Sequence, residues 1–392
     1  MQKFNRIITI VLDSVGIGQC PDSDQFGDYG VNTLGNISQT VGLEVPNMQQ
    51  LGLGNISYIK TVPPVAHPLA NFGKMQEVGN GKDTMTGHWE MMGVTLHDGF
   101  KQYVKEGFPQ ELVDEFVSRV GRGVLANKEA NGMQVIDEFY EEHEQTGKFI
   151  LYTSVDSTWQ MAAREDIIPV EELYQACEVA RELTKDPKYN VARVIARPFI
   201  GKKGGVVRTA NRHDYALDPF ETTVMEKLVN NNLESVAIGK ISDIFNGVGV
   251  SKQIKTKDNM DGVDKTIEEL KQDYSGFIFT NLVEFDSVYG HPRNPEGYRD
   301  ALEDFDKRLP EIMENLKDDD LLIITADHGN DPTYKGNDHT REYVPVLAYS
   351  KQLKGDHLIP QRKTFEDLGE TICDNFGLAS TINGKSFLGD LV

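Results

Sequence analysis

Short apolar runs and stretches with helical spacing alternate along most of the chain. The apolar runs, which have the length of buried strands, lie at 7–12, 235–239, 277–285, 321–324 and 344–349. The stretches with apolar residues on one helical face lie at 222–230, 261–274, 297–316 and 365–376. Pro310 interrupts the third of these stretches and predicts a kinked or split helix. Because strands that alternate with helices form sheets covered by helices, the pattern predicts an α/β fold with a mostly parallel sheet.

The middle of the chain has a pattern of its own. Helices are predicted at 111–120, 134–145 and 170–184, and strands at 149–154 and 191–198. We therefore expect residues 99–217 to form a smaller α/β domain. This domain is inserted between the two parts of a core domain, 1–98 and 218–392.

Composition and charge restrict the binding partners and the cellular compartment that the sequence is compatible with. The net charge of −21 argues against nucleic acid and anionic membranes but not against a small anionic substrate, which responds to local charge. Cys20, Cys177 and Cys373 lie far apart without a C-x-x-C motif, as expected in a reducing cytoplasm. The apolar run that ends before Asp13 is too short for a secretion signal, and none approaches the roughly 20 residues of a membrane span. The oligomeric state is not indicated.

Acidic and histidine residues follow three of the predicted strands. Asp327 and His328 come directly after one strand, and His339 follows in the next loop. Asp13 ends the first strand, and Asp286 ends another, with His291 shortly after it. Ligands of parallel sheets bind at the carboxyl ends of strands, and Asp and His are ligands of Zn²⁺ and Mn²⁺. Each residue also has a simple alternative, as a turn or capping Asp or a loop histidine.

Taken together, the six side chains predict two three-residue metal sites. Two cations about 3.5–4 Å apart can hold the attacking and leaving oxygens of a phosphoryl transfer. Without cations, three crowded carboxylates are expected to raise the pKa of one another.

Thr84 is the candidate nucleophile. Asp83 or Thr84 is placed to cap a helix that runs through 88–92, and a hydroxyl there faces free backbone N–H groups that suit a phosphate. A simple N-cap without catalytic function is the alternative reading. A nearby cation would favour the alkoxide of a threonine.

Several motifs together resemble a known family. The strings are DSVGIG at 13–18, KDTMTGHWE at 82–90, NLVEFD at 281–286, TADHGND at 325–331 and DHTREYVPVLA at 338–348. They resemble the bacterial phosphopentomutases, a family of the alkaline phosphatase superfamily, over essentially the whole chain. The metal motifs are shared by that superfamily, whereas KDTMTGHWE and segments of the insert are specific to the mutases.

The resemblance implies an alkaline-phosphatase-like core, an inserted mobile cap and two Mn²⁺ ions. It implies that Asp286, His291 and His339 hold one cation, and that Asp13, Asp327 and His328 hold the other together with a phosphorylated Thr84. The sugar-phosphate contacts that it implies are Ser154, Asp156, Arg193, Ile195, Arg208 and Lys240. Residues 193–212 contain six Lys or Arg and no acid, which is either a solvated loop or a phosphate-binding patch.

The activity that the resemblance implies is the interconversion of ribose 1-phosphate and ribose 5-phosphate, and of their 2-deoxy analogues. It would use a phosphothreonine and a 1,5-bisphosphate, with a sugar bisphosphate as activator. A phosphatase or a cofactor-independent phosphoglycerate mutase of the same superfamily is the nearest alternative. A non-catalytic protein that binds metal or sugar phosphate is an alternative of another class.

Overall fold

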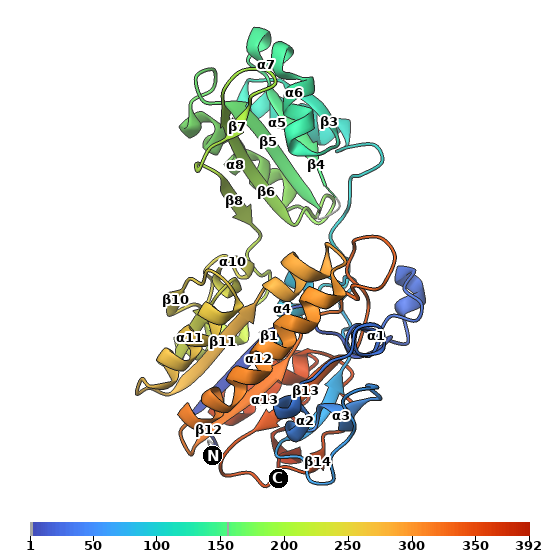
Figure 1. The fold of residues 1–392 in the computed structure, drawn as a ribbon. Helices are drawn as coiled ribbons and strands as arrows, with labels where there is room; N and C mark the ends of the chain where they lie inside the picture. The colour runs from blue at the N-terminus through green and yellow to red at the C-terminus, as the bar shows by residue number, and fades with distance from the viewer. Residues whose placement is uncertain (1–2, 155–156) are drawn as a thin grey trace. The chain divides into compact units, whose positions relative to one another are not determined.

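The computed structural model describes residues 3–154 and 157–392, which divide into two compact units. The core unit comprises Met1–Asp98 and Pro219–Val392, and the inserted unit comprises Gly99–Asp218 (Figure 1). Asp156, a candidate substrate contact, lies outside the described residues. Among the described residues, no helix combines the length and the apolar character that crossing a membrane requires.

A mixed eight-stranded sheet organises the core unit, in the order β10-β9-β11-β1-β12-β13-β2-β14. Its strands are β1 (Arg6–Leu12), β2 (Asn71–Met75), β9 (Glu234–Ile238), β10 (Lys252–Ile254), β11 (Gly276–Leu282), β12 (Asp320–Thr325), β13 (Val344–Tyr349) and β14 (His357–Leu358). The five strands from β10 to β12 are parallel, whereas β13 runs antiparallel to both β12 and β2. β1, β11 and β12 are buried throughout, which explains why they read as continuous apolar runs.

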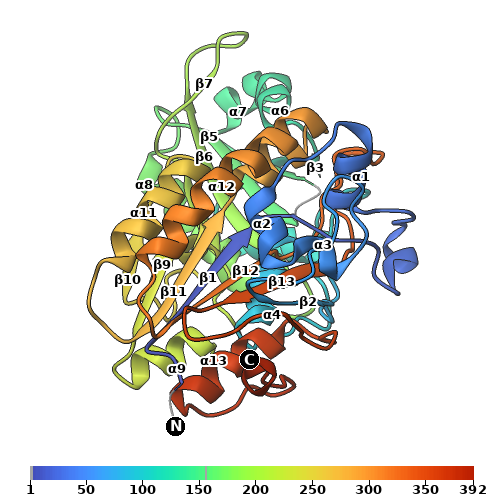
Figure 2. The same ribbon diagram turned by 60° about the horizontal axis from the view of Figure 1, so that its bottom comes forward.

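Helices cover both faces of this sheet (Figure 2). One layer contains α1 (Thr33–Thr40), α2 (Pro46–Leu51), α11 (Asn259–Leu270) and α12 (Pro295–Asn315). The other contains α4 (Thr84–Met91), α9 (Val224–Asn230), α10 (Ile241–Ile244) and α13 (Glu366–Phe376). The remaining short elements are α3 (Leu53–Ile56), the 3₁₀ turns η1 (Ser23–Phe26) and η3 (Leu388–Asp390), and the π-helical turn η2 (Phe285–Gly290).

The inserted unit has a sheet and a core of its own. Its strands are β3 (Val124–Glu129), β4 (Phe149–Thr153), β5 (Thr158–Arg164), β6 (Arg193–Ile200), β7 (Val207–Arg208) and β8 (His213–Ala216). Its helices are α5 (Gln110–Val120), α6 (Gly132–Glu138), α7 (Tyr140–Thr146) and α8 (Val170–Thr184). Trp159 and Phe116 lie in the larger of its two apolar clusters, and Phe199 lies in the smaller one. The predicted fold class, a mostly parallel α/β core with a smaller inserted α/β unit, is confirmed.

Three predicted elements differ in detail. α12 continues through Pro310, so the predicted split is wrong. Pro310 cannot donate to the carbonyl of Asp306, and the side-chain amide of Asn47 donates to that oxygen instead, at 2.9 Å. The single helix predicted at 134–145 is two, because it breaks at Phe139 between α6 and α7. β11 ends at Leu282, so that Asp286 lies in the η2 turn rather than at the end of the strand.

Candidate metal centre

The carboxyl ends of β1, β11 and β12 meet at one edge of the core sheet. In register, Leu12 of β1 pairs with Leu282 of β11, and Val11 pairs with Thr325 of β12. Asp13 follows β1 directly, and Asp327 lies just after β12. The π-helical η2 turn carries Asp286 back toward the same edge. Parallel pairing therefore gathers three carboxylates that are distant in the sequence.

Asp286, His291 and His339 form the first group that could hold a cation. Their ligand atoms lie within 4.8 Å of one another. His291 Nε2 lies 3.2 Å from one oxygen of Asp286, and His339 Nε2 lies 3.3 Å from the other. The Nδ1 atom of His291 lies 2.6 Å from the carbonyl oxygen of Asn337. Because a carbonyl only accepts, Nδ1 carries the hydrogen and Nε2 is left available as a ligand.

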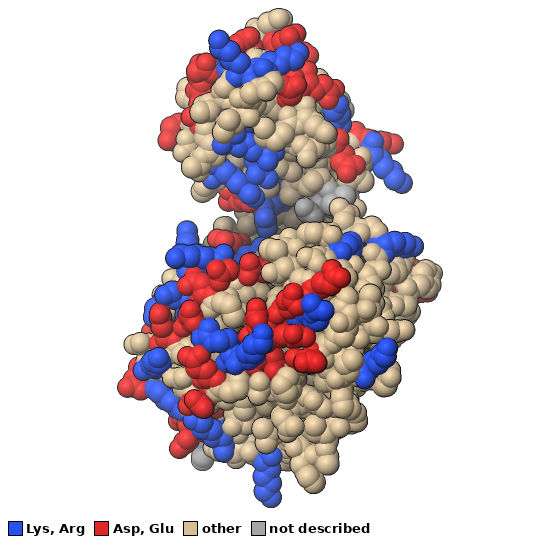
Figure 3. All heavy atoms as spheres, viewed as in Figure 1, with Lys and Arg blue, Asp and Glu red and all other residues tan. Residues whose placement is uncertain are grey.

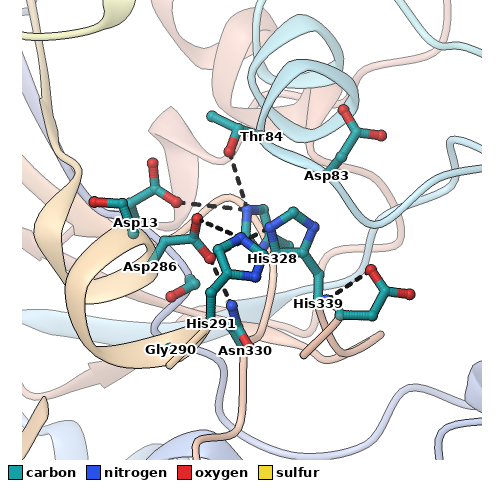
Figure 4. Close-up of polar contacts among 12 residues, drawn as sticks. Asp13, Asp83, Thr84, Asp286, Gly290, His291, His328, Asn330 and His339 are labelled. Carbon is teal, nitrogen blue, oxygen red and sulfur yellow. Dashed lines mark hydrogen bonds and ion pairs between the residues drawn. The ribbon is translucent and has the colours of Figure 1, made fainter. Parts of the chain in front are cut away.

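The second group comprises Asp13, Asp286 and His328, again with ligand atoms within 4.8 Å of one another. His328 Nε2 lies 3.5 Å from Asp13 Oδ1 and 3.3 Å from Asp327 Oδ2. Asp327 therefore borders this group, and Asp286 belongs to both groups. Figure 4 shows Asp13 and Asp286 facing the ring of His328, with His291 and His339 beside it.

Several buried polar atoms at this edge fit cation binding. Asp13 Oδ1, Asp327 Oδ2 and His339 Nε2 receive no hydrogen bond from any described residue. The second oxygen of each aspartate is satisfied: the amide of Asn281 donates to Asp13 Oδ2 at 2.8 Å, and the backbone N–H of Ser14 donates to Asp327 Oδ1 at 3.0 Å. Each of these two carboxylates is thus held by hydrogen bonds to one oxygen, while the other oxygen faces histidine rings. Carboxylate and imidazole ligands in this number suit Zn²⁺ or Mn²⁺.

The pKa values of the three carboxylates shift in different directions, which corrects the expectation that all three rise. Burial and the charges of Asp327 and Asp286 raise the pKa of Asp13 to about 7. Burial also opposes ionisation of Asp286 and Asp327, but neighbouring histidines, chiefly His339 for Asp286 and His328 for Asp327, hold both pKa values below the usual range. The histidines thus compensate two of the three negative charges. A divalent cation would displace protons from both residue types.

Thr84 is the first residue of α4 and is buried, with 8% of its surface exposed. Asp83 caps the helix by accepting from the N–H groups of Met85 and Thr86, so the capping alternative belongs to Asp83 rather than to Thr84. The Thr84 hydroxyl lies 3.3 Å from His328 Nε2 (Figure 4). The candidate nucleophile therefore faces the second metal-binding group from a helix N-terminus, a position that suits a phosphate.

Some side chains that support the centre were not singled out from the sequence. His88 contacts Asp327, Asn281 holds Asp13, and the amide of Asn330 donates to Asp286 Oδ1 at 2.7 Å. Lys82 bridges Asp28 and Asp338, both at 3.1 Å. His88 follows Thr84 by one helical turn, a spacing that could have indicated it. No local pattern marks the two asparagines, because their roles depend on contacts between strands.

Arg341 fixes the loop that leads to Thr84. Its buried guanidinium donates to the backbone oxygens of Glu77 and Gly79 at 2.7 and 2.8 Å. It also pairs with the carboxylates of Glu77 and Asp22. Because Arg341 follows His339 closely in the sequence, it ties the loop before the nucleophile to the loop that carries a candidate ligand.

The candidate substrate contacts fall in both units. Lys240 lies in the core unit just before α10, where its charge lowers the pKa of Asp13 against the larger effect of burial. The other described ones lie in the inserted unit: Ser154 after β4, Arg193 and Ile195 on β6, and Arg208 on β7. Figure 3 shows Lys and Arg side chains gathered on part of this unit.

Basic and polar side chains share one face of the inserted sheet. Arg193, Ile195 and Arg197 alternate along β6 and so point to the same face. Arg208 reaches Tyr152, with Nη2 3.2 Å from the phenol oxygen, and its buried Nε has no hydrogen-bond partner among the described residues. Burial and the charges of Arg212 and Arg208 lower the pKa of Arg197, as expected where cations gather without enough acids. Arg193 differs, because it is paired with Asp214 at 3.5 Å.

Solved structures resemble this chain in fold. The PH0037 protein of Pyrococcus horikoshii matches with a TM-score of 0.50 and 13% identity, over 98% of this chain and 100% of that one. A phosphoglycerate mutase of Leishmania mexicana, solved at low cobalt concentration, matches with a TM-score of 0.51 and 13% identity, over 98% and 97% of the two chains. The model of the metalloenzyme superfamily matches residues 5–380. With that match over nearly the whole sequence, and with acid and histidine side chains gathered as a metal site requires, the chain belongs to the metalloenzyme superfamily.

Proposed function

We propose that the protein is a phosphopentomutase that interconverts ribose 1-phosphate and ribose 5-phosphate, and the corresponding 2-deoxyribose phosphates. One observation carries the proposal: the Thr84 hydroxyl, at the N-terminus of α4, lies 3.3 Å from His328 in a group suited to a cation. The phosphoglycerate mutase with a similar fold supports phosphoryl transfer as the reaction type. The sequence motifs that resemble phosphopentomutases support a pentose phosphate as the substrate.

In this proposal Asp286, His291 and His339 would hold one Mn²⁺ ion, and Asp13, Asp327 and His328 would hold a second. Such ions would supply positive charge that favours the alkoxide of Thr84 and stabilises the phosphoryl oxygens. The protein's own part is to place Thr84 Oγ1 in the first turn of α4, 3.3 Å from His328 Nε2. Asn281, Ser14 and Asn330 keep the carboxylates in orientation.

The transfer steps balance without another co-reactant once Thr84 is phosphorylated. The bond between Thr84 Oγ1 and phosphorus breaks as a sugar hydroxyl oxygen bonds to phosphorus, and the proton of that hydroxyl passes to Thr84. The product is a 1,5-bisphosphate. After the bisphosphate reorients, Thr84 Oγ1 attacks the other phosphorus and returns the proton to the departing sugar oxygen. A sugar bisphosphate supplies the first phosphoryl group and so acts as activator.

The inserted unit would recognise the phosphate that is not being transferred. Arg208 and Arg197 lack carboxylate partners among the described residues, and their guanidinium groups suit bidentate phosphate binding. Ser154, Asp156, Arg193 and Ile195 of the inserted unit and Lys240 of the core unit are proposed as further sugar-phosphate contacts. Holding the phosphate that is not being transferred would orient the sugar hydroxyl toward the phosphothreonine, which favours transfer to sugar over hydrolysis.

The test is to follow phosphate on the protein. Purified enzyme is incubated with Mn²⁺ and a trace of sugar bisphosphate, and mass spectrometry locates the phosphate. We expect one phosphate on Thr84, turnover of ribose 5-phosphate after priming, and neither in Thr84→Ala. Thr86→Ala is the matched control, because its hydroxyl bonds to Asp83 at 2.6 Å rather than facing the centre.

Other outcomes identify the alternatives. Turnover of 3-phosphoglycerate in place of ribose 5-phosphate would indicate a phosphoglycerate mutase, and release of inorganic phosphate alone would indicate a phosphatase. Full mutase activity without any phosphorylated residue would overturn the phosphothreonine mechanism. No turnover together with Mn²⁺ binding unaffected by Thr84→Ala would favour a non-catalytic binding protein.

A further inference from the structure

His88 is completely buried and contacts both the nucleophile and the metal-binding groups. Its Nδ1 lies 2.8 Å from the backbone oxygen of Thr84, one turn earlier in α4. Because a carbonyl oxygen can only accept, Nδ1 must carry a hydrogen and donate it. The same nitrogen lies 3.2 Å from Asp327 Oδ2, the oxygen of that carboxylate without a hydrogen bond. The positive end of this N–H group therefore lies between Thr84 and Asp327.

The other ring nitrogen of His88 faces Asn281. His88 Nε2 lies 3.4 Å from Asn281 Nδ2, which also donates to Asp13 Oδ2 at 2.8 Å. The opposite orientation of the amide would place its oxygen against the Asp13 carboxylate, two acceptors facing each other. Asn281 Nδ2 therefore offers one hydrogen to Asp13 and the other to His88, and His88 Nε2 accepts. This orientation leaves Asn281 Oδ1 buried without a partner among the described residues, which costs the free energy of desolvating that oxygen.

We propose that His88 and Asn281 are positioning residues that form a polar bridge, hydrogen-bonded from the backbone of Thr84 to Asp13 and in charge contact with Asp327. The bridge fixes the start of α4 relative to the two carboxylates, so that the Thr84 hydroxyl keeps its distance from His328. This inference rests on the proposed function of Thr84 as nucleophile. Beyond that function, the bridge sets how tightly Asp13, Asp327 and His328 hold their cation and how fast Thr84 is phosphorylated.

A buried histidine that only fills the core has different partners. His143 in the inserted unit is also completely buried, but its Nδ1 faces the carbonyl oxygen of Lys148 at 2.6 Å and its Nε2 accepts from the backbone N–H of Arg164 at 3.0 Å. Both of its contacts hold backbone segments together. The contacts of His88 instead reach groups that belong to the candidate centre, and its ring packs beside Phe279 of β11, 5.5 Å between centroids.

The experiment uses amide substitutions that keep one ring nitrogen at a time. In His88→Asn, the amide nitrogen can occupy the place of Nδ1 and donate to Thr84. In His88→Gln, it can occupy only the place of Nε2, and His88→Phe keeps the ring volume without either nitrogen. Calorimetric titration of the metal-free full chain with Mn²⁺ alone measures the affinity of both metal sites. The binding step that His339→Ala removes is the one that belongs to Asp286, His291 and His339.

We expect His88→Gln and His88→Phe to lower the Mn²⁺ affinity of the site formed by Asp13, Asp327 and His328 by roughly 10- to 100-fold. The Mn²⁺ affinity of the other site should change far less. The rate at which a sugar bisphosphate phosphorylates Thr84, followed by mass spectrometry, should fall in the same two variants. His88→Asn should restore most of the affinity and the rate. Asn281→Leu should weaken the same Mn²⁺ step, because it frees Asp13.

His143→Phe is the matched control for loss of a buried histidine, and it should leave both Mn²⁺ steps and the phosphorylation rate unchanged. Thermal unfolding of each variant detects those that do not fold. If His88→Phe does not fold, the comparison of His88→Asn with His88→Gln still tests the bridge. Equal behaviour of the Asn and Gln variants, or wild-type Mn²⁺ affinity in both, would overturn the bridge. If the wild-type protein is never phosphorylated on Thr84, the proposed function fails, whereas the Mn²⁺ comparison still tests the bridge.

Discussion

Gly87 of α4 packs directly against the backbone of Asp327, so closely that a methyl group at position 87 would lie 2.3 Å from the Asp327 carbonyl oxygen. Real side chains do not approach backbone oxygens at that distance. The helix that carries Thr84 can therefore reach the end of β12 only because residue 87 has no side chain. This relationship explains the glycine between Thr84 and His88 in the KDTMTGHWE segment.

Gly87→Ala is expected to fold but to lose phosphorylation of Thr84. The added methyl must push α4 away from Asp327, because the opposing atom belongs to the backbone and cannot rotate aside. Overpacking of this kind costs about 1–3 kcal/mol, and a displacement of about 1 Å can lower turnover by about 100-fold. Urea unfolding and the rate of Thr84 phosphorylation measure the two effects. Gly389→Ala is the control, since a methyl there would meet no atom within 4 Å. Unchanged phosphorylation in Gly87→Ala would contradict the tight packing.

His339→Ala is expected to remove one of two bound cations with little loss of stability. Its ring lies on a loop beside His291 and His328, with centroids 4.7 and 4.2 Å apart, and its Nε2 has no hydrogen-bond partner among the described residues. Metal content measured by mass spectrometry after dialysis should fall from two ions per chain toward one. His357→Ala removes an exposed histidine of β14 and should retain both. If His339→Ala keeps its full metal content, His339 is not a ligand.

Arg208→Ala is expected to raise KM for ribose 5-phosphate, by roughly 10- to 100-fold if it removes a charge-assisted hydrogen bond to phosphate. Phosphorylation of Thr84 by a small phosphate donor should change little, because that reaction needs no second phosphate. Lys203→Ala removes a charge from the same segment, but from an exposed pair with Glu141, and should leave KM unchanged.

Gly132→Ala should displace the guanidinium of Arg208 without removing its charge. A methyl group at residue 132 would lie 1.8 Å from Arg208 Nη2 and 2.5 Å from the Tyr152 phenol oxygen. The end of the arginine can move away but the buried Tyr152 ring must shift as well, so the unit should fold with lower stability while the guanidinium is displaced. We expect KM to rise, but less than in Arg208→Ala. Equal loss of substrate turnover and of Thr84 phosphorylation in both variants would indicate a misfolded inserted unit instead.

Glu342 is expected to make the metal-free protein less stable as pH rises from about 4.5 to about 7. Burial, and then the charge of Asp331, raise its pKa from 4.5 to about 7. The unfolded chain releases this proton near pH 4.5 while the folded chain keeps it, so the folded state binds more protons across that window and loses stability as pH increases. Each pKa unit corresponds to about 1.4 kcal/mol, so the effect is up to about 3 kcal/mol.

The measurement compares wild type with Glu342→Gln by urea unfolding at pH 5 and pH 8, with chelator present. The stability advantage of the wild type should shrink at the higher pH. The glutamine loses part of the hydrogen bonding that Glu342 accepts from the hydroxyls of Thr33 and Thr340, which lowers stability similarly at both pH values. An advantage that grows with pH would mean that Glu342 is ionised throughout.

The sequence by itself determined the elements that build the core sheet and the residue types at their ends. Buried parallel strands need continuous apolar runs, and such a run followed by an acid is visible at Asp13 and Asp327 without any structure. Capping is equally local, and Asp83 accepts the N–H groups that its position before a helix predicts. The order of strands along a sheet is not local, which is why β13 could be recognised as a strand but not as an antiparallel one.

The tertiary structure alone decided which side chains at the ends of the strands contact one another. Asp286 belongs to both metal-binding groups although it lies in the π-helical η2 turn, four residues after the end of β11. Asp13 and Asp327 both lie beside His328, but their pKa values shift in opposite directions because burial and the charges of two other carboxylates act on Asp13, whereas His88 adds to the effect of His328 on Asp327. The bridge through His88 and Asn281 joins residues from α4 and β11. Hydrophobic periodicity specifies which face of an element is buried, but distances of 3–4 Å between side chains on different elements exist only once those elements have packed.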